Sequence, residues 1–220
     1  MRVRFAVLFL ALALNAGGAS AQAEATASQR SGFLGDYSQL QPAKGREGVL
    51  TFIRKGDYKG YTKVMIDPIE VWQNPAADYK GMPAAAMVRL ADGISGSFKR
   101  ALEPQYQVVT SPGPDVLRVR IAVTGITPVK PDVKATDFIP IKAVFTAVSG
   151  GKPNVVELSA EMEVLDASNT RVAAAVANRK GDKALDQGEQ VTWKHLEAIS
   201  DYWAKGFRQG LDELRGSTPN

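Results

Sequence analysis

The chain has 220 residues, enough for one large or two small domains, and its 45% hydrophobic and 23% charged residues are typical of a globular protein and exclude wholesale disorder. It contains no cysteine, which excludes disulfides, thiolate nucleophiles and cysteine-bound zinc or iron–sulfur clusters. His195 is its single histidine, so a site that needs two imidazoles from one chain is excluded as well.

Residues 1–23 have the pattern of a secretory signal peptide. Two arginines precede the apolar run 5–14, which is shorter than the roughly 20 residues that cross a bilayer, and small residues follow it. We expect cleavage after Ala23, or alternatively after Ala21, and export to the periplasm without a transmembrane segment. Removing the two arginines lowers the formal net charge from +4 to +2. Such a small charge gives no support to a nucleic-acid partner.

The mature chain begins with a short polar stretch. Residues 24–30 are rich in Ala, Ser and Thr and are expected to form a flexible tether, followed by a single domain over 31–216. Within this domain, Val, Ile, Phe and Tyr are frequent in 49–54 and 61–72, which predicts two strands. The glycines of 56–60 predict the turn between them.

The middle of the chain changes its hydrophobic period. In 83–102 the apolar residues recur every three or four positions, which predicts an amphipathic helix. In 116–124 they alternate with polar residues, as in a strand with one buried face. For 143–148 we favour a strand over a short helix.

A hairpin and a second helix end the domain. The alternation of 156–164 and 171–178 around a short turn predicts two antiparallel strands, and we expect 179–190 to be a loop. An apolar stripe over 193–214 predicts a helix, with Thr192 as its cap. The order of elements indicates an α+β fold: a two-layer sandwich of an antiparallel or mixed sheet with two helices packed on one face.

Several segments together suggest a family. They are 31–38 (SGFLGDYS), 64–72 (VMIDPIEVW), 112–118 (PGPDVLR), 161–172 and the tryptophans at 193 and 203. With these segments the sequence resembles a family of bacterial envelope proteins, mostly described as lipoproteins and catalogued as a domain of unknown function. The resemblance implies an exported protein, but no activity, ligand or catalytic residue. The family's common lipid-bearing cysteine is absent here, which argues against a lipid anchor.

The densest polar cluster is Asp67, Glu70 and Trp72, near the end of a predicted strand. Two carboxylates beside an aromatic ring could bind a cation or a sugar, so these three residues are the candidate binding site. Pro68 after Asp67 is typical of a strand end, and the acids alternate with apolar residues. A structural role for the cluster is therefore the favoured interpretation.

Other charged residues alternate along the predicted strands. Glu157, Glu161 and Glu163 share a strand face. They are expected to pair with Arg118 and Arg120 across neighbouring strands, on a solvated sheet surface. His195 lies in the first turn of the last predicted helix, where we expect a surface or capping residue.

No nucleotide-binding, serine-hydrolase or zinc-protease motif is present, and no residue is assigned to catalysis, to a metal or to a cofactor. We therefore predict a non-enzymatic envelope protein that binds or helps to assemble another envelope protein. One alternative is a periplasmic binding module for a small anionic or glycan ligand at the candidate binding site. Another is a glycan-acting enzyme that uses Asp67, Glu70 or Asp115 as acid and base. The oligomeric state is left open.

Overall fold

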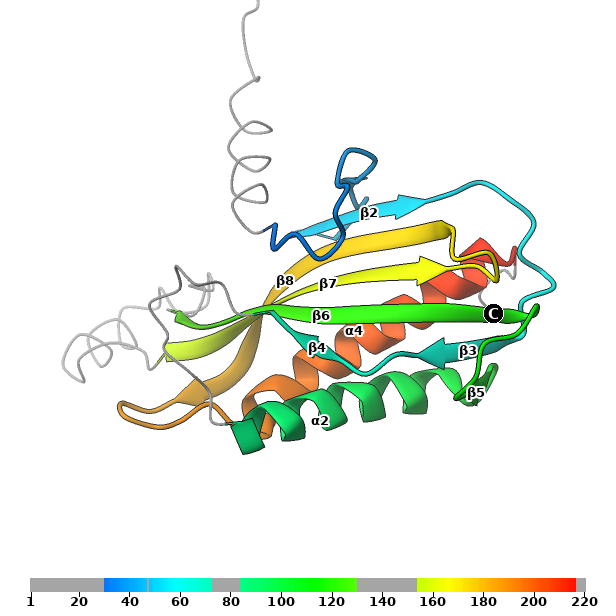
Figure 1. Ribbon diagram of the computed structural model, residues 1–220. Coiled ribbons are helices and arrows are strands. Elements are labelled where there is room, and N and C mark those ends of the chain that lie inside the picture. Colours follow the sequence, from blue (N-terminus) through cyan, green and yellow to red (C-terminus); the bar gives the residue numbers. More distant parts are fainter. Residues whose placement is uncertain (1–29, 47, 73–83, 130–153, 217–220) are drawn as a thin grey trace, which may run out of the picture. The chain divides into compact units, whose positions relative to one another are not determined.

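Two long helices form where the apolar periodicity predicts them (Figure 1). In the computed structural model, which describes residues 30–46, 48–72, 84–129 and 154–216, helix α2 spans Ala84–Leu102 and helix α4 spans Trp193–Leu214. The described residues from Ser31 onward belong to one compact unit. The predicted element at 143–148 lies outside the described residues.

The N-terminus of α4 is closed by Thr192 and His195. The backbone N–H of Thr192 donates to Nδ1 of His195 over 3.0 Å, so His195 is a capping residue as predicted. The histidine is only 1% exposed, however, and its backbone carbonyl lies close to Gly181 of the last strand. The alternative expectation of a surface residue is therefore wrong.

The described strands form one mixed sheet in the order β1-β2-β8-β7-β6-β3-β5, with β4 also paired to β6. Strand β3 pairs in parallel with β5 and β6, and β4 pairs in parallel with β6, whereas the other neighbours are antiparallel. This arrangement confirms the α+β class with a mixed sheet. The strands are β1 (Gln41–Pro42), β2 (Val49–Ile53), β3 (Lys63–Ile66), β4 (Glu70–Val71), β5 (Gln107–Val109), β6 (Val116–Val129), β7 (Asn154–Leu165) and β8 (Arg171–Leu185).

The hairpin of β7 and β8 is longer than predicted. Strand β8 continues to Leu185, which pairs with Asn154, so the first part of the expected loop 179–190 is strand. Gly181 permits this continuation, because a β-carbon there would lie 3.0 Å from the carbonyl oxygen of His195. The strand can therefore pass close to the start of α4.

The sheet has two different faces. On the helix-side face, which α2 and α4 cover, β6 and β7 present apolar residues such as Leu117 and Leu158 to the main core (Figure 1). On the opposite side, here called the outer face, β6 and β7 present charged residues. A second, smaller core forms there, where Phe33 and Leu34 of the N-terminal segment (residues 31–40) pack on Ala174. The N-terminal segment therefore covers part of the outer face.

Candidate functional site

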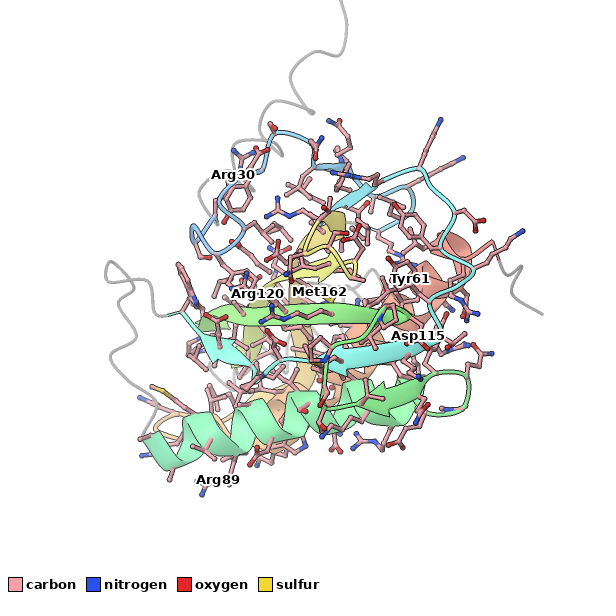
Figure 2. The ribbon with its side chains drawn as sticks, turned by 45° about the vertical axis from the view of Figure 1, so that its right-hand side comes forward. Arg30, Tyr61, Arg89, Asp115, Arg120 and Met162 are labelled. Carbon is pink, nitrogen blue, oxygen red and sulfur yellow. The ribbon has the colours of Figure 1, made fainter. Side chains whose placement is uncertain are left out.

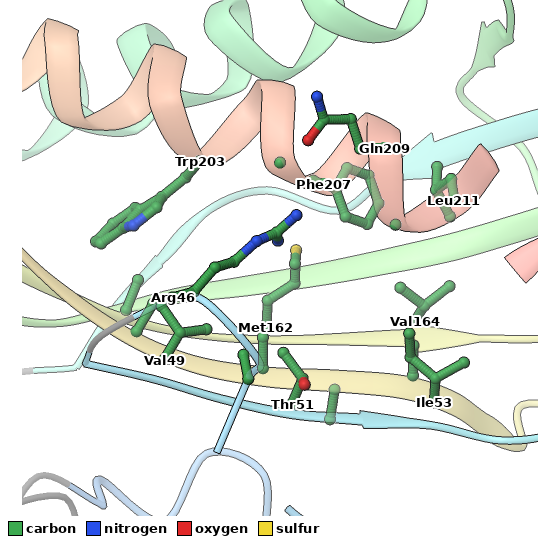
Figure 3. A pocket seen from close by; sticks show the side chains of 18 of the residues that line it. Arg46, Val49, Thr51, Ile53, Met162, Val164, Trp203, Phe207, Gln209 and Leu211 are labelled. Atoms are coloured by element: carbon green, nitrogen blue, oxygen red, sulfur yellow. The ribbon is translucent and has the colours of Figure 1, made fainter. Parts of the chain in front are cut away.

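An apolar pocket of about 640 Å³ lies between α4 and strands β2, β8 and β7 (Figure 3). Its floor is made of small side chains, because β8 directs Ala173, Ala175 and Ala177 toward the helix side. The register confirms this direction: Ala175 pairs with Met162 on one side and with Thr51 on the other, and both line the pocket. Three alanines in alternate positions leave space that larger side chains would fill.

The solvent exposure of the β8 side chains also indicates an open space beneath α4. Ala173, Ala175 and Ala177 are partly exposed although they belong to an inner strand, whereas the intervening Ala174 and Val176 are only 5% and 3% exposed. On this strand the side chains beneath the helix are therefore more accessible than those beneath the N-terminal segment.

The pocket is roofed by one stripe of α4. Trp203, Phe207 and Leu211 follow each other at intervals of four residues and face the sheet (Figure 3). Phe207 also contacts Phe98 of α2, with ring centroids 5.5 Å apart, which closes the pocket toward the main core. A volume of this size is typical of small-molecule sites. The lining can therefore bury an apolar ligand.

Polar groups lie at a few places around the pocket. The indole Nε1 of Trp203 is buried and has no hydrogen-bond partner among the described residues. Arg46 reaches from the loop before β2 toward α4, between Trp203 and Phe207 (Figure 3). Lys44 and Lys205 line the same pocket and are exposed.

The residues of the candidate binding site lie elsewhere, beside the outer face. Asp67 accepts hydrogen bonds from Nε and Nη2 of Arg118, over 3.0 and 2.7 Å. This two-pronged pairing raises the pKa of the Arg118 guanidinium. The carboxylate of Asp67 is thus already bound by an arginine of β6.

Glu70 and Trp72 lie together. Trp72 donates from Nε1 to Oε2 of Glu70 over 2.9 Å, and Arg120 donates to Oε1 of Glu70 over 3.3 Å. The Trp72 ring meets Phe33 edge to face, at 5.8 Å between centroids. The structure therefore brings two of the three candidate residues together and binds Asp67 to a different arginine.

The carboxylates of the hairpin are buried. Glu163, 4% exposed, accepts from Nη1 of Arg120 (labelled in Figure 2) over 2.5 Å and from Nε of Arg171 over 2.8 Å. The expected pairing across strands is thus confirmed for Arg120 and wrong for Arg118, which binds Asp67. Glu161 is 0% exposed, with Ser31 N–H at 2.7 Å and the Tyr37 hydroxyl at 2.6 Å as donors. The expectation of a solvated surface is wrong for these two residues, because the N-terminal segment covers them.

The N-terminal segment is also held by backbone acceptors. Arg171 donates to the carbonyl oxygens of Leu34 and Asp36. The guanidinium of Arg120 lies over the Phe33 ring, 4.8 Å from its centroid. Arginines of the outer face thus hold the N-terminal segment in place.

Asp115, labelled in Figure 2, lies just before β6, and its carboxylate binds the Lys63 ammonium of β3 over 2.9 Å. This hydrogen bond lowers the pKa of Asp115, which favours the anion, whereas a general acid must hold its proton. Each of the three carboxylates considered for glycan hydrolysis is therefore engaged by a different basic residue.

The described residues offer neither a metal site nor a membrane-spanning helix. Within the described ranges, no group of three or more His, Asp or Glu side chains is placed to hold a metal ion. Among the described helices, none has the length and apolar character needed to span a bilayer.

Sequence reasoning missed the pocket. Its signal was the alanines at alternate positions of the second strand of the predicted hairpin, Ala173, Ala175 and Ala177, where Val or Ile would be the common choice. A small side chain repeated at every second position of a buried strand indicates space on that face.

Comparison with known proteins gives a family and several distant relatives. The model of a family described as "Protein of unknown function (DUF3313)" matches residues 29–207. The uncharacterized lipoprotein YdcL of Escherichia coli (strain K12) is 22% identical over 178 residues, which cover 78% of this chain and 80% of the relative.

Solved structures show weaker likeness. A PelC dodecamer from Paraburkholderia phytofirmans has a TM-score of 0.40 and 12% identity, and the match covers 76% of this chain and 96% of that one. Protein XCC0632 from Xanthomonas campestris, of the DUF330 family, has a TM-score of 0.40 and 13% identity, and the match covers 69% and 84% of the two chains.

Proposed function

This chain belongs to the DUF3313 family of proteins of unknown function, and on that premise we propose a function from its geometry: it is an exported envelope protein that binds an apolar ligand beneath α4. The pocket of about 640 Å³ carries this proposal. Burying apolar ligand surface there releases roughly 25 cal/mol per Å², which can drive the binding of an apolar ligand. We therefore infer that the protein acts by binding.

Two observations support the location. The first 23 residues have the pattern of a signal peptide, and a relative at 22% identity is named a lipoprotein. Both agree with a periplasmic protein at the cell envelope.

We infer a structural role for Asp67, Glu70 and Trp72. Their side chains fasten β6 to the neighbouring chain segment and to Phe33 through arginine pairs and a ring contact. The binding site is accordingly placed in the pocket, where apolar surface is accessible, and not at these carboxylates, which already have partners.

A neutral fluorescent probe tests the proposal. The protein, purified with its leader processed, is titrated with N-phenyl-1-naphthylamine, which fluoresces in apolar surroundings. Ala175→Leu places a large side chain on the pocket floor and should weaken probe binding at least tenfold. Ala85→Leu makes the same change at an exposed position of α2 and should leave binding unchanged.

The outcome divides plainly. Saturable binding that only Ala175→Leu removes supports a ligand site beneath α4. Absence of binding by the wild-type protein, or equal binding by both variants, would overturn the proposal.

A further inference from the structure

The pocket is elongated along α4. Its roof runs from Trp203 to Leu214, a separation of eleven residue steps along one helix, or about 16 Å at 1.5 Å per step. The large apolar residues that α4 contributes to the pocket, Trp203, Phe207, Leu211 and Leu214, form one stripe at three- and four-residue spacing. An extended alkyl chain can lie along this stripe.

Basic residues gather at one part of this space. Lys44 and Arg46 come from the loop before β2, and Lys205 comes from α4. None of these three side chains forms an ion pair with another described residue. The acidic Glu213 also lines the pocket, but it lies seven residues along α4 from Gly206, a rise of about 10 Å.

Arg46 is the central basic group. It is partly buried, and a β-carbon at Gly206 would lie 3.4 Å from its Nη1, so the guanidinium lies against α4 at this glycine. A guanidinium in such a position gains from an anionic partner, because its five donors match the oxygens of a carboxylate or phosphate.

Trp203 supplies a second, independent observation. Its Nε1 is buried without a partner among the described residues, although a buried indole N–H usually donates a hydrogen bond. Trp203 lines the pocket next to Arg46 (Figure 3). Nearby, Arg179 stacks on Tyr202, another lining residue, at 3.7 Å from the ring centroid, which adds positive charge to this end.

We infer that the ligand is an amphiphile with a single alkyl chain and an anionic head group. The inference rests on the proposed function and deepens it. The chain lies on the alanine floor beneath the α4 stripe, and the head group is bound by Arg46, with Lys44 and Lys205 beside it and the Trp203 N–H as a further donor. A carboxylate and a phosphate head share this chemistry.

Alkyl probes with the same chain test the head group. Dodecanoate, dodecyl phosphate, 1-dodecanol and dodecyltrimethylammonium compete with N-phenyl-1-naphthylamine, all below their micelle concentrations. We expect at least one anionic probe to bind tenfold or more tightly than the alcohol, and the cation to bind most weakly. The order of the two anions distinguishes a fatty acid from a phosphate-bearing lipid as the source.

Arg46→Gln should remove the advantage of the anion over the alcohol, a loss of roughly tenfold to a hundredfold that corresponds to a hydrogen bond with a charged group. The far-UV circular dichroism of this variant should match that of the wild-type protein, which shows that it is folded. Lys55→Gln removes an exposed lysine outside the pocket and should leave the advantage of the anion unchanged. Lengthening the chain should tighten binding about fourfold per methylene until the pocket is full.

The two proposals fail differently. If all four alkyl probes bind equally and Ala175→Leu abolishes their binding, the apolar site stands and the anionic head group is wrong. If the Arg46→Gln variant prefers the anion over the alcohol as strongly as the wild-type protein does, the assignment of the head group to Arg46 is wrong. If no probe binds the wild-type protein, both the ligand class and the proposed function are wrong.

Discussion

The two faces of the sheet are covered in opposite ways. The helix-side face is apolar and has two long helices over it, yet a pocket of about 640 Å³ is left between α4 and the alanines of β8. The outer face carries charged residues and has only the N-terminal segment over it, yet Glu161 and Glu163 are 0% and 4% exposed. The polar face is thus closed where the segment lies, and the apolar face is partly open.

The difference shows that a sheet face can be covered by other elements without the space between them being filled by side chains. On the outer face each buried carboxylate has at least two donors, so it is satisfied without water. On the helix-side face the floor residues are too small to reach the roof, and nothing in the described chain replaces the missing volume. Space of this kind is retained at binding sites, although filling it would add stability.

The largest expected effect comes from breaking the charge network of the outer face. Glu163→Gln removes the anion between Arg120 and Arg171 and leaves two guanidinium groups without their shared partner. We expect the free energy of unfolding to fall by about 2–3 kcal/mol, because both arginines keep some contact with solvent. Urea denaturation measures the change. Glu157→Gln, the same substitution at a partly exposed position of the same strand, should cost less than about 0.5 kcal/mol.

A smaller effect comes from loosening the N-terminal segment. Tyr37→Phe removes the hydroxyl that donates to Glu161 and accepts from the backbone N–H of Gly32 over 2.8 Å. The expected loss is about 1–2 kcal/mol in thermal unfolding, because Glu161 stays buried with one donor fewer. Tyr61→Phe, whose hydroxyl has only a 3.5 Å contact with the Ala167 N–H, serves as the control. Equal losses in the two variants would show that the segment is not held by this bond.

The main core contains a buried tyrosine, Tyr106, whose contribution to stability can be measured from its pH dependence. Burial and the 2.8 Å hydrogen bond to Asp212 raise the pKa of Tyr106 to about 12. Tyrosine in the unfolded chain ionises near pH 10, so the unfolded state loses its proton first and stability falls as the pH rises above 10. Relative to Tyr106→Phe, the wild-type protein should lose about 1 kcal/mol between pH 8 and pH 11. A constant difference between the two proteins over this range would contradict a protected hydroxyl.

Much of the fold could be predicted from hydrophobic period. The three- and four-residue spacing gave both helices, and alternation identified β6 and the β7–β8 hairpin, because burial of one face selects these periods. Alternation also predicted that the glutamates of β7 would meet Arg118 and Arg120 across strands, which holds for Arg120 with Glu163 but not for Arg118, which binds Asp67. Pattern alone could not show which face would be covered. A polar stripe is usually solvated, and the covering segment around Phe33 and Tyr37 is irregular and distant in sequence.

The site was less accessible to sequence reasoning for a related reason. Charged residues such as Asp67 and Glu70 are obvious candidates for ligand groups. In the structure, however, each of these two carboxylates forms an ion pair with an arginine of β6. The pocket depends instead on the absence of side-chain volume at Ala173, Ala175 and Ala177, and on a basic residue, Arg46, that reaches it from a separate loop. Such a site becomes visible only when the strand register is known.

Two neighbouring alanines of β8 test the central contrast most directly. Ala174→Leu and Ala175→Leu make the same change one residue apart. Both residues border the pocket, but Ala174 is only 5% exposed and packs in the small core with Phe33 and Leu34, whereas Ala175 is partly exposed on the helix side. In urea denaturation, Ala174→Leu should lower the free energy of unfolding by about 1–3 kcal/mol through overpacking, whereas Ala175→Leu should change it by less than about 1 kcal/mol in either direction. Equal destabilisation by the two variants would contradict an open space beneath α4.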